Sequence, residues 1–282
     1  MVRLVLCDMD LTLVPRGRQT VTEVALEAFR DLRALGVRVG PASGRGIHDL
    51  RTLFAESDEC LDTAVASNGC IVRLDGRTIA EHPVDQEELK RVLELVAPLP
   101  DTFLTVDTAE GHIALGSSYD EVREHYRDWP GFDMLVHIEL PDGPIFKANV
   151  CLPRHARDAE ERRHNEALVE RLRAACPHTD FCLLGGHVAD MMPKGISKAT
   201  GLLEIVEAAR LSLDEVLVFG DSENDEEILR TVTGSVAVAN ATPMIRELAR
   251  YHVGRCEDDS VAHALADLAC AMKNGEYPRW MR

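Results

Sequence analysis

Two pairs of aspartates stand directly after apolar runs of the sequence. Asp8 and Asp10 follow the run at residues 2–7, and Asp221 and Asp225 follow a second run later in the chain. A spacing of two along a strand points both side chains to one face. Like charges held close disfavour each other's ionisation unless a cation or hydrogen bonds compensate. Carboxylate oxygens suit a hard cation such as Mg²⁺, so a shared metal ion would explain both pairs.

Each pair also has a purely structural interpretation. Aspartate is common in turns that follow strands, which would account for Asp8 and Asp10. Acidic residues at the start of a helix are favoured by the helix dipole and by capping, which would account for Asp225, Glu226 and Glu227. The helix interpretation leaves the first pair unexplained, whereas metal binding explains both.

Lys198 stands where a purely structural interpretation expects an acid. Ser197 can serve as an N-cap, which puts Lys198 in the first turn of a helix. A cation there opposes the helix dipole at a cost of roughly a few tenths of a kcal/mol. A phosphate to bind, or a carboxylate to keep ionised, would justify the lysine. Lys194, in a Pro-Lys-Gly turn, is the competing candidate and is explained as ordinary loop chemistry.

The elements that would carry these residues alternate between strand and helix. Over the first third of the chain, short β-branched runs alternate with helical patterns, the first of which starts with a possible capping box of Thr20 and Glu23. The alternation returns late in the chain and predicts a parallel sheet covered by helices. Ligands of such sheets lie beyond the carboxyl ends of the strands. Polar residues follow four of the expected strands, at residues 8–12, 43–45, 67–69 and 220–225.

The middle of the chain has a different pattern. Two strands across a turn are expected at residues 103–116, further strands at 145–152 and 188–193, and exposed helices at 119–129 and 158–176. The apolar runs are short, and the charged helices have a single apolar face, which together indicate a smaller sheet with helices along one side. We therefore expect an inserted α+β domain at residues 82–189, between two parts of an α/β core at residues 1–81 and 190–282.

The composition excludes several classes of function. The 282 residues carry a formal net charge of −17, whereas sequence-independent binding to nucleic acid or to anionic membranes needs a basic surface. No apolar run is long enough to span a bilayer, and no secretory signal opens the chain. The eight cysteines are scattered without CxxC pairs, which favours free thiols. We expect a soluble cytoplasmic protein with neither nucleic acid nor membrane as a partner.

Three of these polar segments, together with Lys198, resemble in their order the four motifs of the haloacid dehalogenase superfamily. DMDLTL, at residues 8–13, is similar to the first motif, DxDx(T/V), and GDSEND, at residues 220–225, is similar to the fourth. Ser43 in SGR resembles the hydroxyl residue of the second motif, and Lys198 in ISKATG resembles the lysine of the third. SNG after the third strand, the large insertion, PKGISK and AVANATP indicate the Cof-type group. Serine in place of threonine in the second motif is a mild departure that preserves the hydroxyl.

The resemblance implies a fold and a mechanism. The fold would be α/β, a Rossmann-like parallel-sheet core with an inserted α+β cap domain. Asp8 would be the nucleophile that forms an aspartyl-phosphate, and Asp10 the general acid and then the general base. Mg²⁺ would be held by Asp8, Asp221 and the backbone carbonyl of Asp10, with Asp225 in support.

Other residues would contact the substrate or order the loops around it. The resemblance implies that Ser43 and Lys198 contact the transferring phosphoryl oxygens, where charge concentrates, and that Thr12 orders the first loop. The candidate substrate-binding residues are Thr12, Gly44, Arg45, Asn68, Asn224, Lys147 and His187. For Arg45, Asn68 and Asn224, holding loops together is an equal alternative. Lys147 and His187 would be cap contacts, with a strand-surface lysine and a plain hairpin turn as their structural alternatives.

Three functions remain open at this point. The first expectation is a Mg²⁺-dependent phosphatase of a small phosphorylated metabolite, such as a sugar phosphate or a phosphorylated cofactor intermediate. A phosphomutase would return the phosphate to a second hydroxyl instead of water. A non-catalytic metabolite-binding regulator would be expected to lack the nucleophile, and all four motifs are intact. Dehalogenase activity is disfavoured because it needs neither Asp10 nor Asp221.

Overall fold

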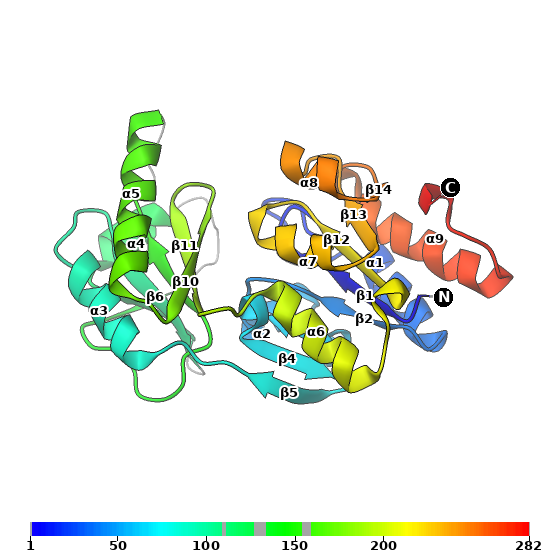
Figure 1. Cartoon of the computed structure of the whole chain (residues 1–282), viewed down its shortest axis with the longest axis horizontal. Coiled ribbons are helices and arrows are strands. Elements are labelled where there is room, and N and C mark those ends of the chain that lie inside the picture. The colour runs from blue at the N-terminus through cyan, green and yellow to red at the C-terminus, as the bar shows by residue number, and fades with distance from the viewer. Residues whose placement is uncertain (1, 109–110, 127–133, 154–158, 282) are drawn as a thin grey trace. The chain divides into compact units, whose positions relative to one another are not determined.

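The computed structural model describes residues 2–108, 111–126, 134–153 and 159–281 (Figure 1). The chain divides into two compact units. The core unit contains Met1–Glu81 and Ser197–Arg282, and the inserted unit contains His82–Ile196. The first division falls after Glu81, where the sequence places it. The second falls after Ile196 instead of residue 189, because residues 188–193 form a strand of the inserted unit's sheet.

A five-stranded parallel sheet forms the centre of the core unit, in the order β14–β13–β12–β1–β2. Its strands are β1 (Leu4–Cys7), β2 (Arg38–Pro41), β12 (Val216–Gly220), β13 (Gly234–Ala237) and β14 (Tyr251–His252). Every residue of β1 and β12 is buried, as expected for strands covered on both faces by helices. The strand β1 lies between β2, which follows it in the chain, and β12, which belongs to the last third. Open parallel sheets bind ligands at such a reversal of strand order.

Helices flank this sheet in two groups. Helix α1 (Glu23–Ala34) packs against α9 (Ser260–Asn274), and α6 (Lys198–Ala209) packs against α7 (Glu226–Thr231), on the other side of the sheet in Figure 1. The shorter helices are α2 (Ile47–Leu53) and α8 (Pro243–Leu248). Among the described residues, no helix is long and apolar enough to cross a membrane.

The start of α1 differs from the capping box expected of Thr20 and Glu23. The N-cap is Thr22, whose hydroxyl accepts a hydrogen bond from the Ala25 amide at 3.3 Å and donates one to Asp259 at 2.6 Å. This long-range bond fixes Thr22 against the residue that precedes α9. The local sequence does not distinguish Thr20 from Thr22 as the N-cap, and the contact with Asp259 favours Thr22.

The third strand does not extend the parallel sheet. Strand β3 (Ala64–Ala66) pairs antiparallel with β4 (Ile71–Leu74), which pairs with β5 (Arg77–Glu81). One parallel bridge, between Ala42 and Val65, joins β3 to the end of β2. The chain can reverse directly after β3 because residues 67–69 all have positive φ, at 49°, 54° and 100°. Hairpin pairing therefore replaces the crossover that the alternating pattern predicted.

The inserted unit is an α+β layer. Its six-stranded sheet has the order β10–β11–β9–β6–β7–β8, and the one parallel pair within it is β7–β8. The strands are β6 (Phe103–Thr108), β7 (Gly111–Leu115), β8 (Met134–His137), β9 (Ala148–Cys151), β10 (Thr179–Leu184) and β11 (Val188–Pro193). Alternate residues of β6, β7, β9, β10 and β11 form an apolar cluster with helices α3 (Gln86–Val96) and α5 (Ala159–Ala175). Helix α4 (Tyr119–His125) contributes to a second, smaller cluster. Residues 127–129 of the helix expected at 119–129 lie outside the described residues.

Candidate active site at the carboxyl edge of the parallel sheet

The residues singled out by the sequence follow three adjacent strands of the core sheet. Asp8 follows β1, Ser43 follows β2, and Asp221 follows β12. Because β1 pairs in parallel with both neighbours, the three strand ends meet at one edge of the sheet. The Asp8 amide continues the ladder by donating to the Phe219 carbonyl at 2.9 Å, which fixes the first carboxylate against β12.

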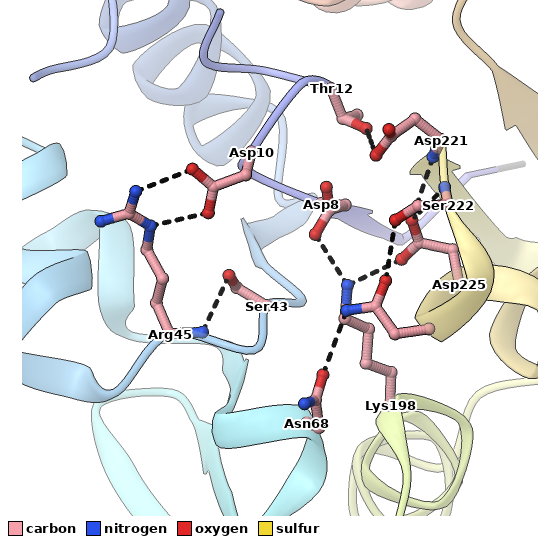
Figure 2. Close-up of polar contacts among 11 residues, drawn as sticks. Asp8, Asp10, Thr12, Ser43, Arg45, Asn68, Lys198, Asp221, Ser222 and Asp225 are labelled. Carbon is pink, nitrogen blue, oxygen red and sulfur yellow. Dashed lines mark hydrogen bonds and ion pairs between the residues drawn. The ribbon is translucent and has the colours of Figure 1, made fainter. Parts of the chain in front are cut away.

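Lys198 joins two of the carboxylates inside this edge (Figure 2). Its Nζ donates to Asp8 Oδ1 and to Asp225 Oδ1, both at 2.7 Å, and its side chain is completely buried. The expected N-cap is confirmed: the Ser197 hydroxyl accepts from the Thr200 amide, so that Lys198 is the first residue of α6. The unfavourable position in the helix dipole is thus explained by two carboxylates that hold the ammonium.

The fourth segment folds back on itself around Asp225. Oδ2 of Asp225 accepts from the backbone amides of Asp221 at 3.0 Å and Ser222 at 3.3 Å. Asp221 Oδ1 accepts from the Thr12 hydroxyl at 3.0 Å, so that Thr12 ties the loop after β1 to the loop after β12. Both Asp225 oxygens therefore accept hydrogen bonds from protein donors.

Two glycines, to which the sequence pattern assigned no role, make room for the close packing around these carboxylates. A Cβ on Gly220, at the end of β12, would lie 2.7 Å from the Asp225 Cγ. A Cβ on Gly201, in the first turn of α6, would lie 2.7 Å from Cγ1 of Val65. The close approach of α6 to β3 places the Lys198 side chain at the sheet edge. The local sequence does not show that glycine is needed at either position. Gly220 is crowded by Asp225, which the turn folds back onto it, and Gly201 is crowded by Val65, which is distant in the chain.

Asp10 has a different environment from Asp8, which corrects the expectation that both side chains share one face. Strand β1 ends at Cys7, and Leu11 has a left-handed φ of 63°, so the alternation of a strand does not continue through this segment. The Asp10 carboxylate is about half exposed and receives two hydrogen bonds from Arg45, at 2.7 Å to each oxygen. The like charges are separated and paired with different cations.

The other predicted core residues lie around the same edge. Ser43 is buried, and its hydroxyl accepts from the Arg45 amide at 3.2 Å across Gly44. Asn224 Nδ2 donates to Asn68 Oδ1 at 3.3 Å, which links the loop after β12 to the turn after β3. Arg45, Asn68 and Asn224 thus make the loop-to-loop contacts that were the alternative to substrate binding.

Asn240 is a further residue of this edge that the sequence pattern did not assign. Its Nδ2 donates to the Leu11 carbonyl at 2.7 Å, and its Oδ1 accepts from the Cys256 amide at 2.8 Å. Asn240 therefore holds the left-handed residue of the loop that carries Asp8 and Asp10. The available signal was its place in AVANATP, just after the apolar run that forms β13.

The buried carboxylates shift one another's pKa values. Burial raises the pKa of Asp8 well above its ordinary value; Lys198 opposes this rise, and Asp225 and Asp221 add to it. Burial, followed by the charge of Asp225, raises the pKa of Asp221 to about 7. For Lys198, burial alone would lower the pKa, but Asp225 and Asp8 outweigh burial and raise it. The cluster therefore keeps its ammonium charged, and its carboxylates resist full ionisation because one lysine cannot neutralise all three.

The donor set fits a hard divalent cation. Asp8, Asp221 and Asp225 offer carboxylate oxygens that all lie within 4.8 Å of one another, and all three residues are buried. When all three carboxylates are ionised, the single ammonium of Lys198 leaves two negative charges, which one divalent cation would cancel. Only oxygens are offered, which is the ligand set of Mg²⁺ in proteins.

The two candidate residues of the inserted unit have structural contacts of their own. Lys147 precedes β9, and its Nζ donates to Oδ1 of the buried Asp190 at 2.9 Å. His187 lies in the turn between β10 and β11, where its Nδ1 is 2.9 Å from the Gly185 carbonyl oxygen. These contacts are made within the inserted unit and leave substrate binding by either residue a proposal.

Fold and site together define an α/β protein with an acidic, lysine-bridged cluster at the reversal point of a parallel sheet. The model of the haloacid dehalogenase-like hydrolases matches residues 5–265 of the chain. The chain belongs to this family of enzymes, and the resemblance inferred from the four motifs is confirmed.

Relatives match over nearly the whole length. The chain is 25% identical over 274 residues to a protein named HMP-PP phosphatase from Yersinia pseudotuberculosis, which covers 94% of each sequence. The structure of SMU.1108c from Streptococcus mutans superposes with a TM-score of 0.81 at 17% identity and covers 96% of this chain and all of that one. The sugar phosphatase BT4131, titled a subclass IIB member of the superfamily, superposes with a TM-score of 0.76 at 20% identity, over 94% and 98% of the two chains. The two structures establish the fold, an α/β core with an inserted domain.

Proposed function

We propose that the protein is a Mg²⁺-dependent phosphatase that hydrolyses a small phosphorylated metabolite through an aspartyl-phosphate on Asp8. The observation that carries the proposal is the buried cluster of three carboxylates and one ammonium, which has two uncancelled negative charges when all three carboxylates are ionised. A fold gains no stability from such an excess of buried charge. The cluster is explained if a cation and a phosphoryl group complete it.

Asp8 is the group best placed to attack phosphorus. Lys198 holds its Oδ1, and the Phe219 carbonyl holds its backbone amide, so that the orientation of the carboxylate is fixed before the substrate arrives. Attack forms a bond between the Asp8 oxygen and phosphorus and releases the alcohol oxygen with its electron pair. Splitting the transfer into two steps in this way is established chemistry for carboxylates.

Asp10 and two donors complete the proposed reaction. In the first step Asp10 gives a proton to the leaving oxygen, and in the second step it takes a proton from the water that attacks the aspartyl-phosphate. Its half-exposed position suits exchange of protons with water and with the leaving group. Lys198 and the Ser43 hydroxyl would donate hydrogen bonds to the phosphoryl oxygens, where negative charge concentrates in the transition state.

Asp8 and Asp221 are the carboxylates that would hold Mg²⁺, together with the backbone carbonyl of Asp10. Asp225, whose two oxygens accept hydrogen bonds from Lys198 and from two backbone amides, would support them. When bound, Mg²⁺ would supply charge that keeps both carboxylates ionised and neutralises the phosphoryl oxygens. We place the reaction in the cytoplasm, which is supported by eight scattered cysteines that form no CxxC pair.

The test is phosphate release from p-nitrophenyl phosphate by the purified full chain. Mg²⁺ should support turnover, EDTA should stop it, and added Mg²⁺ should restore it. Asp8→Asn should abolish turnover, whereas Asp31→Asn, on the exposed surface of α1, should not change it. Turnover that is indifferent to EDTA would overturn the metal assignment, and substantial activity of Asp8→Asn would overturn the nucleophile assignment.

The substrate and the fate of the phosphate need a second experiment. A panel of phosphorylated metabolites should include sugar phosphates and HMP-PP, because a relative is named HMP-PP phosphatase. Release of inorganic phosphate without any sugar bisphosphate would support a phosphatase. A requirement for a bisphosphate, with isomerised sugar phosphate as the product, would assign a mutase instead.

A further inference from the structure

Asp10, the proposed proton-transfer residue, forms an ion pair with Arg45 through two hydrogen bonds. Arg45 Nε donates to Asp10 Oδ2 and Arg45 Nη2 donates to Asp10 Oδ1, both at 2.7 Å. Two parallel hydrogen bonds from one guanidinium fix the plane of the carboxylate as well as its position. Figure 2 shows this pair beside the Asp8 cluster, on the opposite side from Asp221.

Both ends of the pair are attached to the framework of the site. The Arg45 amide donates to the Ser43 hydroxyl at 3.2 Å, and the Arg45 carbonyl accepts from the Ser67 amide at 2.9 Å. On the other side, the Leu11 amide next to Asp10 donates to the Val14 carbonyl at 2.8 Å. The guanidinium therefore reaches Asp10 from a fixed base, 35 positions away in the sequence.

The place of this pair at the proposed site, more than its geometry, distinguishes it from another ion pair of the described residues. Ion pairs in which both side chains reach solvent contribute little to folding, and the exposed fractions are 22% for Arg45 and 48% for Asp10. A second two-bonded pair, Arg38 with Asp75, has distances of 2.9 and 2.8 Å and similar exposure. Arg38 begins β2, at the opposite end of the strand from the proposed site, and so offers a matched control.

We propose that Arg45 is a positioning residue that acts through Asp10. It holds the Asp10 carboxyl group so that one oxygen can deliver a proton to the leaving oxygen as the phosphorus–oxygen bond breaks, and can later take a proton from the attacking water. Arg45 itself gives up no proton and forms no bond to phosphorus. This inference rests on the proposed phosphatase function.

The leaving group distinguishes this role from direct binding of the phosphate by Arg45. p-Nitrophenolate is stable enough to leave without a proton, whereas the phenolate of phenyl phosphate is more basic and depends on proton transfer. Loss of a residue that acts through Asp10 must therefore harm phenyl phosphate more. Loss of a phosphate contact would harm both substrates alike, since their phosphate groups are identical, and would do so largely through KM.

The experiment compares kcat and KM on p-nitrophenyl phosphate and phenyl phosphate for the wild type, Arg45→Ala, Arg45→Lys and Arg38→Ala. General acid catalysis contributes about 10²–10⁴-fold, so we expect the loss of kcat/KM in Arg45→Ala to be at least about 10-fold larger on phenyl phosphate. The ratio kcat/KM is compared because it reports the step in which the leaving group departs, whereas hydrolysis of the aspartyl-phosphate is common to both substrates. Arg45→Lys should show the same discrimination, because lysine keeps the charge and loses the two-bonded fork. Any loss of activity in Arg38→Ala should be the same on both substrates.

The Asp10→Asn background gives the decisive control. There, Arg45→Ala should cause no additional discrimination between the two substrates, because the group through which it acts is already lost. Equal losses of kcat/KM on both substrates, full rescue by Arg45→Lys, or discrimination that persists in the Asp10→Asn background would each overturn the assignment of Arg45. Failure of the wild type to release phosphate from either ester would instead overturn the proposed phosphatase function, and the Arg45 inference with it.

Discussion

Asp221→Asn should stabilise the metal-free protein at neutral pH, although it removes a proposed metal ligand. Asp221 is buried, and its carboxylate lies within 4.8 Å of those of Asp8 and Asp225. Asparagine removes the charge and keeps an oxygen that can accept the hydrogen bond from Thr12. The variant thus relieves repulsion without an obvious loss of contacts.

The size of the effect follows from the pKa of Asp221. Burial and then Asp225 raise this pKa from 3.8 to about 7, and each unit corresponds to about 1.4 kcal/mol. The ionised carboxylate therefore costs the folded state about 4 kcal/mol. This value is an upper limit, because side-chain movement and water entry relieve part of the repulsion. Half of it corresponds to roughly 4–8 °C in the unfolding midpoint of a unit of this size.

The effect depends on pH with a defined sign. Since the folded-state pKa of Asp221 lies above its ordinary value, the folded wild type holds an extra proton between about pH 4 and pH 7. That contribution to stability is complete below pH 4 and is lost as the pH rises through about 7. Wild type and Asp221→Asn should have similar midpoints at pH 4.5 (within about 1–2 °C) and should diverge by pH 8, in EDTA. Mg²⁺ at pH 8 should raise the midpoint of the wild type and leave that of the variant nearly unchanged.

Thermal unfolding followed by circular dichroism provides the assay, at pH 4.5 to 8 with EDTA or Mg²⁺. Asp225→Asn is the matched control: its amide nitrogen would face the donors of Lys198 or of two backbone amides, so this neighbouring variant should be destabilised. The reasoning is refuted if metal-free Asp221→Asn is no more stable than the wild type at pH 8, or if the difference does not change with pH.

Three further predictions concern the framework of the site. Lys198→Met removes the ammonium between two buried carboxylates and should destabilise the metal-free protein by about 3–5 kcal/mol, measured by urea unfolding; a loss below about 1 kcal/mol would contradict the buried pairing. Gly220→Ala should lower kcat on p-nitrophenyl phosphate, because its Cβ would lie 2.7 Å from the Asp225 side chain; unchanged activity would show that the turn adapts freely. Ellman's reagent at pH 8 should label Cys270, the exposed thiol, before all others, since six of the eight cysteines are buried; rapid labelling of Cys7, whose pKa is raised by burial and by Asp8, would contradict the packing of β1.

The parts of the site that the sequence predicts are those set by local order along the chain. Asp8 and Asp221 follow apolar runs that become parallel strands, so their convergence follows from the general rule for sheet edges. Ser197 is placed correctly because a cap is a local hydrogen bond. A functional role could be predicted for Lys198 because a cation in the first turn of a helix is unfavourable unless it has an anionic partner.

The parts that the sequence could not predict depend on distant side chains. The two-bonded ion pair between Arg45 and Asp10 joins two loops, and the sequence of neither loop indicates that it contacts the other. The capping threonine of α1 was placed two residues early, because the bond from Thr22 to Asp259 spans 237 positions. Strand β8 was not expected, because its three residues after Met134 are exposed and lack the buried alternation that marks a strand.

The spacing of Asp8 and Asp10 is explained by the different, distant residues with which they pair. Two carboxylates two positions apart would repel each other on one face of a strand, but β1 ends before either residue. One carboxylate is buried against a lysine from α6, and the other is half exposed under an arginine that follows β2. A nucleophile needs a fixed, water-poor position, whereas a group that exchanges protons with a leaving group and with water needs access to both. The fold therefore supplies two different environments within three consecutive residues, and the division of roles proposed for them follows from that difference.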